Sequence, residues 1–64
     1  MFKANEILIN IYHPVNKVKF IKMNPENEHE FVGMDEHGLY SEHWDIRAYV
    51  SLTRWEEVVA NVLG

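Results

Sequence analysis

The sequence contains no cysteine, and this absence removes two of the ways in which a short chain is stabilised. Disulfides and thiolate zinc sites are both excluded. A chain of 64 residues allows one domain, residues 1–64, with a thin margin of stability. It must therefore rely on close packing, on self-association or on a partner. The lack of cysteine also fits a reducing compartment, and we expect a cytoplasmic protein.

The sequence also lacks any apolar run that approaches the roughly 20 residues needed to span a bilayer. Asn5, Glu6 and Asn10 interrupt the N-terminal apolar residues, so we expect no signal peptide and no membrane association. No motif for a cofactor is present, and we expect none to be bound.

Positive charge is missing from the middle of the chain. Residues 26–45 contain seven carboxylates and neither lysine nor arginine, whereas the net charge of the whole chain is −4. The carboxylates are Glu26, Glu28, Glu30, Asp35, Glu36, Glu42 and Asp45. If this segment folds to one side, the protein has an acidic face that would favour a partner with a basic surface.

The pattern of apolar residues predicts mostly strands. Residues 6–12 and 17–23 are rich in β-branched side chains, and we expect Ile7, Ile9, Ile11, Val18 and Phe20 to face the core. A turn at residues 24–27 separates them from a weaker strand over 29–34. Gly33 indicates a bulge or a close backbone approach, and residues 35–38 a hairpin tip with Gly38 at positive φ.

Two more elements complete the predicted fold. Alternation over residues 44–52 predicts a half-buried strand with Trp44, Ile46 and Val50 on one face and Tyr49 on the other. From Leu52 the apolar spacing becomes helical, with Thr53 and Glu56 as a capping box and Gly64 as the end. Trp44 and Trp55 are expected to be core anchors. The sequence therefore predicts an α+β fold: an antiparallel sheet of three to five strands with one C-terminal helix packed on it. A partly open small barrel is the competing form.

Three groups of polar residues contain side chains that are able to carry chemistry. Ser41, His43 and Asp45 have the residue types of a hydrolytic triad, but on a strand they would stand parallel at i, i+2 and i+4. The histidines next to carboxylates (His29, His37 and His43) match no zinc spacing, so we expect loop residues in solvent and no metal. The lysines of Lys17–Lys22 flank Phe20 as in a nucleic-acid-binding strand, yet the chain is acidic overall. We therefore expect neither catalysis nor nucleic-acid binding, and the latter stays as an alternative.

Some apolar residues have the wrong parity for a single core. They are Leu8, Tyr12, Ile21, Met23 and Tyr49. Either the sheet curls into a small barrel that hides them, or they form an exposed patch, and such patches mark interfaces.

The leftover apolar set and the acidic segment together predict the function class. We expect a small non-catalytic protein-binding module, a regulator or inhibitor of a larger partner such as a viral (phage) or mobile-element accessory protein. The expected partner-binding residues are Tyr12, Ile21, Glu28, Glu30, Asp35, Glu36 and Tyr49. The alternative is a homo-oligomeric structural protein, such as a homodimer, in which the same apolar set is self-complementary.

Overall fold

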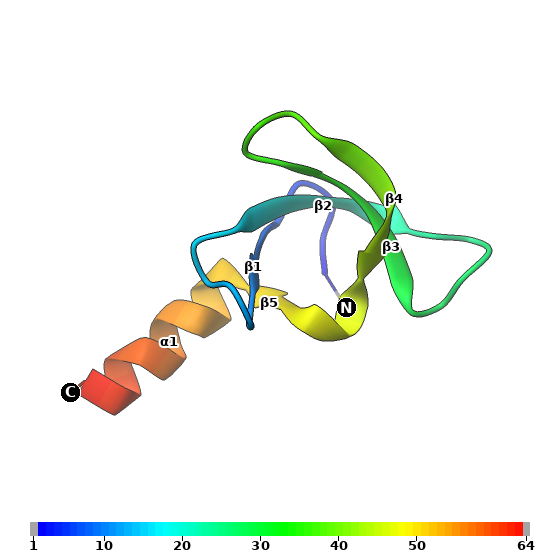
Figure 1. The fold of residues 1–64 in the computed structure, drawn as a ribbon. Helices are drawn as coiled ribbons and strands as arrows, with labels where there is room; N and C mark the ends of the chain where they lie inside the picture. The colour runs from blue at the N-terminus through cyan, green and yellow to red at the C-terminus, as the bar shows by residue number, and fades with distance from the viewer. Residues whose placement is uncertain (1, 64) are drawn as a thin grey trace.

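Five short strands form one open antiparallel sheet in the computed structural model, which describes residues 2–63. The strands are β1 (Ile7–Asn10), β2 (Lys17–Met23), β3 (Glu30–Asp35), β4 (Tyr40–Asp45) and β5 (Tyr49–Ser51). Their order across the sheet is β4-β3-β2-β1-β5, so the first strand lies between the second and the last. A 3-10 turn, η1 (Ile46–Ala48), carries the chain from β4 to β5, and helix α1 (Leu52–Leu63) follows. The fold is α+β, as predicted (Figure 1).

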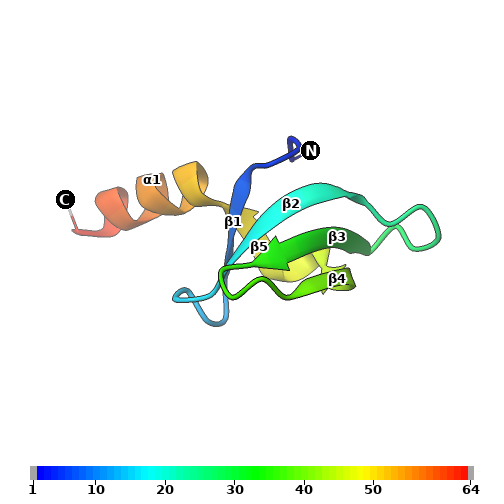
Figure 2. The ribbon, with the colours of Figure 1, turned by 90° about the horizontal axis from the view of Figure 1, so that it is seen from above.

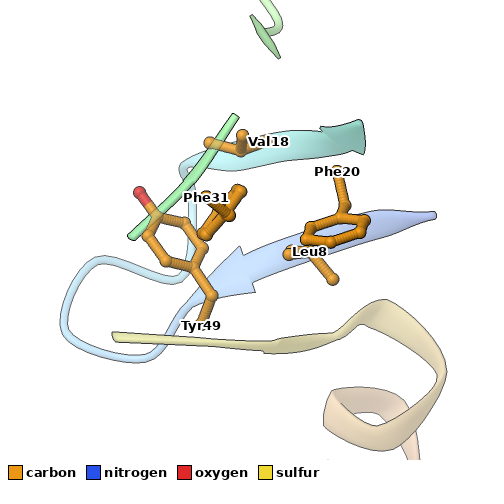
Figure 3. Packing of buried hydrophobic residues seen from close by; sticks show 5 residues of the cluster. All are labelled: Leu8, Val18, Phe20, Phe31 and Tyr49. Atoms are coloured by element: carbon orange, nitrogen blue, oxygen red, sulfur yellow. The ribbon is translucent and has the colours of Figure 1, made fainter. Parts of the chain in front are cut away.

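The sheet is strongly curved, and its concave side holds the core. The core cluster consists of Leu8, Val18, Phe20, Phe31 and Tyr49 (Figure 3). The ring centroids of Phe20 and Phe31 lie 5.5 Å apart and those of Phe31 and Tyr49 5.4 Å apart, so the aromatic rings of three strands meet in a chain. Such pairs add stabilisation beyond the area that they bury.

Two irregularities in strand pairing bend the sheet. The β2–β3 register shifts between Phe20 and Lys22, which leaves Ile21 without a partner, and the β3–β4 register shifts between Phe31 and Gly33. Bulges increase the local twist and curve a sheet. At Gly33 a Cβ atom would lie 2.8 Å from the backbone oxygen of Lys19, so this residue must be glycine for β2 and β3 to approach. The predicted close backbone approach at Gly33 is confirmed, and both register shifts lie beside this residue.

Strand β1 is buried on both faces, which corrects the predicted orientation of its isoleucines. Leu8 points into the core and is 0% exposed, while Ile9 on the opposite face is 1% exposed. Helix α1 contacts β1 and β5, and this contact covers the second face. Ile11 lies beyond the end of β1 and is exposed. The strand ends at Asn10 because its Oδ1 accepts the amides of Tyr12 (2.8 Å) and His13 (3.1 Å), which turns the chain.

The predicted strand over residues 44–52 is wrong, because the chain bends after Asp45. The Asp45 side chain accepts the backbone N–H of Arg47 and caps the 3-10 turn. This turn resets the alternation, so Tyr49 enters the core at 8% exposure instead of facing away from it. Trp44 and Ile46 remain half-buried against the core cluster, as expected of an anchor at Trp44.

The cap of the C-terminal helix lies two residues earlier than predicted, and the helix begins at Leu52. Ser51 Oγ accepts the amide of Arg54 at 3.1 Å, so Ser51 caps the helix in place of Thr53. Trp55 is half-buried but does not belong to the core cluster, because the helix lies on the outer side of β1 and β5 and points away from the sheet (Figure 2). The predicted helix end at Gly64 lies outside the described residues.

Candidate functional site

The seven predicted partner-binding residues fall in different parts of the fold. Tyr12 is 72% exposed on the loop after β1, and Ile21 is half-buried at the β2 bulge. Glu28 is exposed on the β2–β3 loop, and Glu30 begins β3. The others are Asp35 at the end of β3, Glu36 at the hairpin tip and Tyr49 in the core.

One end of the sheet collects most of the exposed apolar surface. The described residues include eight exposed large hydrophobic side chains, and five of them lie on the β1–β2 loop or at the β3–β4 tip. They are Ile11, Tyr12, Val15, Leu39 and Tyr40. Since consecutive strands of an antiparallel meander place alternate loops at the same end, these two segments are neighbours in space. We call this end of the molecule the loop end.

A cleft of about 170 Å³ opens at the loop end between these segments. We call it the loop-end cleft, and its walls include Val15, Lys17, Asp35, Glu36, His37, Trp44 and Tyr49. Its rim therefore carries two carboxylates against one lysine. The structure thus brings together three of the predicted residues, Asp35, Glu36 and Tyr49, whereas Glu28 and Glu30 lie near the opposite end.

The acidic rim of the cleft is held in place by hydrogen bonds within the hairpin tip. Asp35 Oδ1 accepts the amides of His37 at 2.9 Å and Leu39 at 2.8 Å. Gly38 completes the tip with φ of 83°, a conformation that L side chains rarely adopt. Asp35 therefore has a structural role, and Glu36 is the exposed carboxylate of the rim.

The aromatic wall of the cleft is rigid. Trp44 Nε1 donates to the backbone oxygen of Gly33 at 3.1 Å, and the Trp44 and Tyr49 rings meet edge to face with centroids 6.3 Å apart. The hydroxyl of Tyr49 points away from Leu8 and Phe20 (Figure 3). Tyr49 thus reaches the cleft with its polar end while its ring remains in the core, so it cannot be the exposed aromatic anchor that its parity predicted.

A separate pair of charged groups lies on the β3–β4 edge of the sheet. His43 Nδ1 and Glu30 Oε1 are 3.0 Å apart, and the hydrogen bond and charge of Glu30 raise the pKa of His43 above its ordinary value. Asp45 pairs with Arg47 at 3.1 Å, and the pKa of Asp45 is lowered by hydrogen bonds from Arg47. Ser41 Oγ accepts the amide of His43 at 3.0 Å. The side chains of Ser41, His43 and Asp45 therefore bond to the His43 amide, to Glu30 and to Arg47, respectively.

The histidines and the lysine-rich strand β2 are the other two groups of side chains that are able to carry chemistry. Among residues 2–63, no three His, Asp or Glu side chains are placed to share a metal ion. Phe20, the aromatic of the lysine-rich strand, is 4% exposed and lies in the core, so it is not available for stacking on a base. Within the same part of the chain, no helix has the length and apolar character that crossing a bilayer requires.

Comparisons of the chain with models of known protein families, with curated proteins and with solved structures found no match.

Proposed function

We propose that this protein is a small non-catalytic protein-binding module that regulates or inhibits a larger partner through its loop end. The observation that carries the proposal is the gathering of five exposed apolar side chains at the end of the sheet where a cleft with an acidic rim opens. Exposed apolar surface is costly to keep on a small protein, and a patch of this kind is typical of an interaction site.

The chemistry of the loop-end cleft favours a basic side chain of the partner as the group that enters it. A lysine or arginine would meet the carboxylate of Glu36 at the rim, and its alkyl stem would pack against Trp44 and Tyr49 in the cleft wall. Tyr12 and Val15 on one loop and Leu39 on the other would pack around this contact. Tyrosine is one of the residue types that most often contribute strongly to binding.

Site-specific photocrosslinking in the source cells tests the proposal, because it captures a partner whose identity is still open. A photoreactive phenylalanine analogue at His37, on the loop-end cleft, is expected to yield a discrete crosslinked protein. The matched control places the same analogue at Asn27, an exposed position on the β2–β3 loop at the other end of the sheet. Equal crosslinking from both positions, or from Asn27 alone, would contradict the assignment of the loop end.

Charge reversal at the rim provides the second measurement. Once the crosslinked protein is purified, Glu36→Lys is expected to slow its association at least tenfold and to reduce the salt dependence of the rate. Glu28→Lys changes the net charge by the same amount at the other end of the molecule and serves as the control. If both variants slow association equally, the effect comes from net charge and not from the cleft.

A further inference from the structure

Helix α1 extends beyond the body of the protein. The molecule measures 40 × 24 × 19 Å, and Figures 1 and 2 both show the helix projecting from β5 away from the sheet. Its apolar stripe is therefore covered only in part. Trp55 and Val59 are half-buried, whereas Val58 is 43% and Val62 78% exposed. A helix of this length is marginal in water unless its apolar side is packed, so this stripe needs a partner.

The outer face of the sheet carries a groove beside the start of this helix. A cross-strand row on this face runs through Ile7, Lys19, Met34 and Tyr40, because each is the register partner of the next. Ile7 and Met34 line a groove of about 440 Å³ together with Leu52, the first residue of α1. Lysine and carboxylate side chains surround these apolar residues. We call this feature the outer groove, and its charged walls are Lys17, Lys19, Asp35 and Glu36.

The charges of the helix match those of the outer groove in both signs. Glu56 and Glu57 are exposed on the helix, and Lys17 and Lys19 line the groove; Arg54 could face Asp35 and Glu36. The ion pairs formed within residues 2–63 are His29–Glu28, His43–Glu30 and Arg47–Asp45, so they use none of these groups. The helix projects away from the sheet (Figures 1 and 2), so its later turns, which carry Val58 and Val62, reach such a groove only in a second molecule.

We propose that a second copy of this chain occupies the outer groove with its helix α1. Each copy offers one helix and one groove, so a two-fold axis would satisfy both at once, as in an isologous dimer. Val58 and Val62 of one copy would cover Ile7 and Met34 of the other. A standard interface buries at least about 600 Å² per copy. That is roughly an eighth of the 4741 Å² surface of this chain.

Two charge-reversed variants of the full chain test this arrangement. In Lys19→Glu, the groove of one copy repels the acidic helix of a second copy of the same variant. In the variant with Glu56→Lys and Glu57→Lys, the helix of one copy repels the lysines in the groove of a second copy. Each variant alone is expected to be monomeric by sedimentation equilibrium, with a dimer dissociation constant at least tenfold weaker than that of the parent. An equimolar mixture is expected to restore the dimer, because both contacts are then complementary. These changes leave the residues specific to the loop-end cleft intact, so crosslinking from His37 should persist.

Two controls accompany this experiment. Lys22→Glu reverses an exposed lysine of the same strand that does not line the groove, and this variant should dimerise like the parent. Val62→Glu changes a side chain that is 78% exposed and should abolish the dimer without altering the circular dichroism spectrum. A parent chain that stays monomeric up to about 1 mM, or a mixture that does not recover the dimer, would overturn the proposal.

Discussion

The indole of Trp44 donates its Nε1–H to the backbone carbonyl of Gly33, on the neighbouring strand β3, over 3.1 Å. Gly33 is also the point at which β2 and β3 approach too closely for a side chain. Gly33 thus links the bend of the sheet to the aromatic wall of the loop-end cleft. A change in the curvature of the sheet would therefore change the shape of the cleft.

Removing this hydrogen bond should cost measurable stability. Trp44→Phe leaves the Gly33 carbonyl without its donor and loses part of the aromatic packing, so the free energy of unfolding should fall by about 1–2 kcal/mol. Urea denaturation followed by circular dichroism measures the change. Tyr40→Phe, at an exposed position of the same strand, is the control and should unfold like the parent. An unchanged midpoint for Trp44→Phe would show that the bond contributes nothing net.

The two carboxylates of the hairpin tip should separate into a structural and a free one. Asp35→Ala removes the acceptor of two backbone amides and should destabilise the fold by about 1–2 kcal/mol. Glu36→Ala should leave the melting temperature within experimental error because Glu36 is exposed. Thermal unfolding of both variants at the same ionic strength tests this. Equal effects would mean that general charge repulsion, and not hydrogen bonding, determines the stability of the tip.

Phe31 rather than Trp55 should prove the more sensitive core position. Phe31 is 0% exposed at the centre of the aromatic chain, and Phe31→Ala should cost about 3–5 kcal/mol. Trp55 lies half-buried on the projecting helix, so Trp55→Ala should cost clearly less. Denaturation of the two variants at low micromolar concentration, where dimerisation contributes least, gives the comparison. A larger loss for Trp55→Ala would place the helix at the centre of the fold.

The Glu30–His43 pair should make stability depend on pH in a definite direction. The pKa of His43 is raised in the folded state, so folding favours its protonated form. This contribution is complete below the ordinary pKa of 6.5 and is lost as pH rises through the raised value. Glu30→Gln should therefore lower the melting temperature more at pH 5.5 than at pH 8.5. An NMR titration of the histidine ring protons should show the His43 pKa falling in this variant, and an unchanged pKa would contradict the pairing.

Sequence patterns predict the elements of this fold better than the faces they present. Strand β2 has its predicted bounds because Val18 and Phe20 alternate cleanly with lysines. The pattern places Leu8 and Tyr49 on the wrong side of the sheet, and the reason differs between the two residues. The pattern assumes one buried face and an unbroken strand, whereas β1 is covered on both sides and Asp45 interrupts the chain before Tyr49.

The candidate site was predictable only in its local parts. The hairpin tip at Asp35 and Glu36 follows from turn chemistry that is written in neighbouring residues. The outer groove depends instead on a row that crosses four strands, from Ile7 to Tyr40. Its register is set by bulges and by the curvature of the sheet, which no local pattern determines. The tip could therefore be found from sequence, and the groove could not.

The central position of β1 has a consequence for the synthesis of the chain. Ile9 of β1 pairs with Val50 of β5, which lies 41 residues later in the chain. This edge of β1 therefore stays unpaired until β5 has been synthesised. At about 5–20 residues per second, translation leaves that edge of β1 open for roughly 2–8 s. During this interval the strand presents unpaired backbone groups and the bare side chains of Leu8 and Ile9 to its surroundings. Each nascent copy is then a target for chaperones or for β1 of a neighbouring nascent chain.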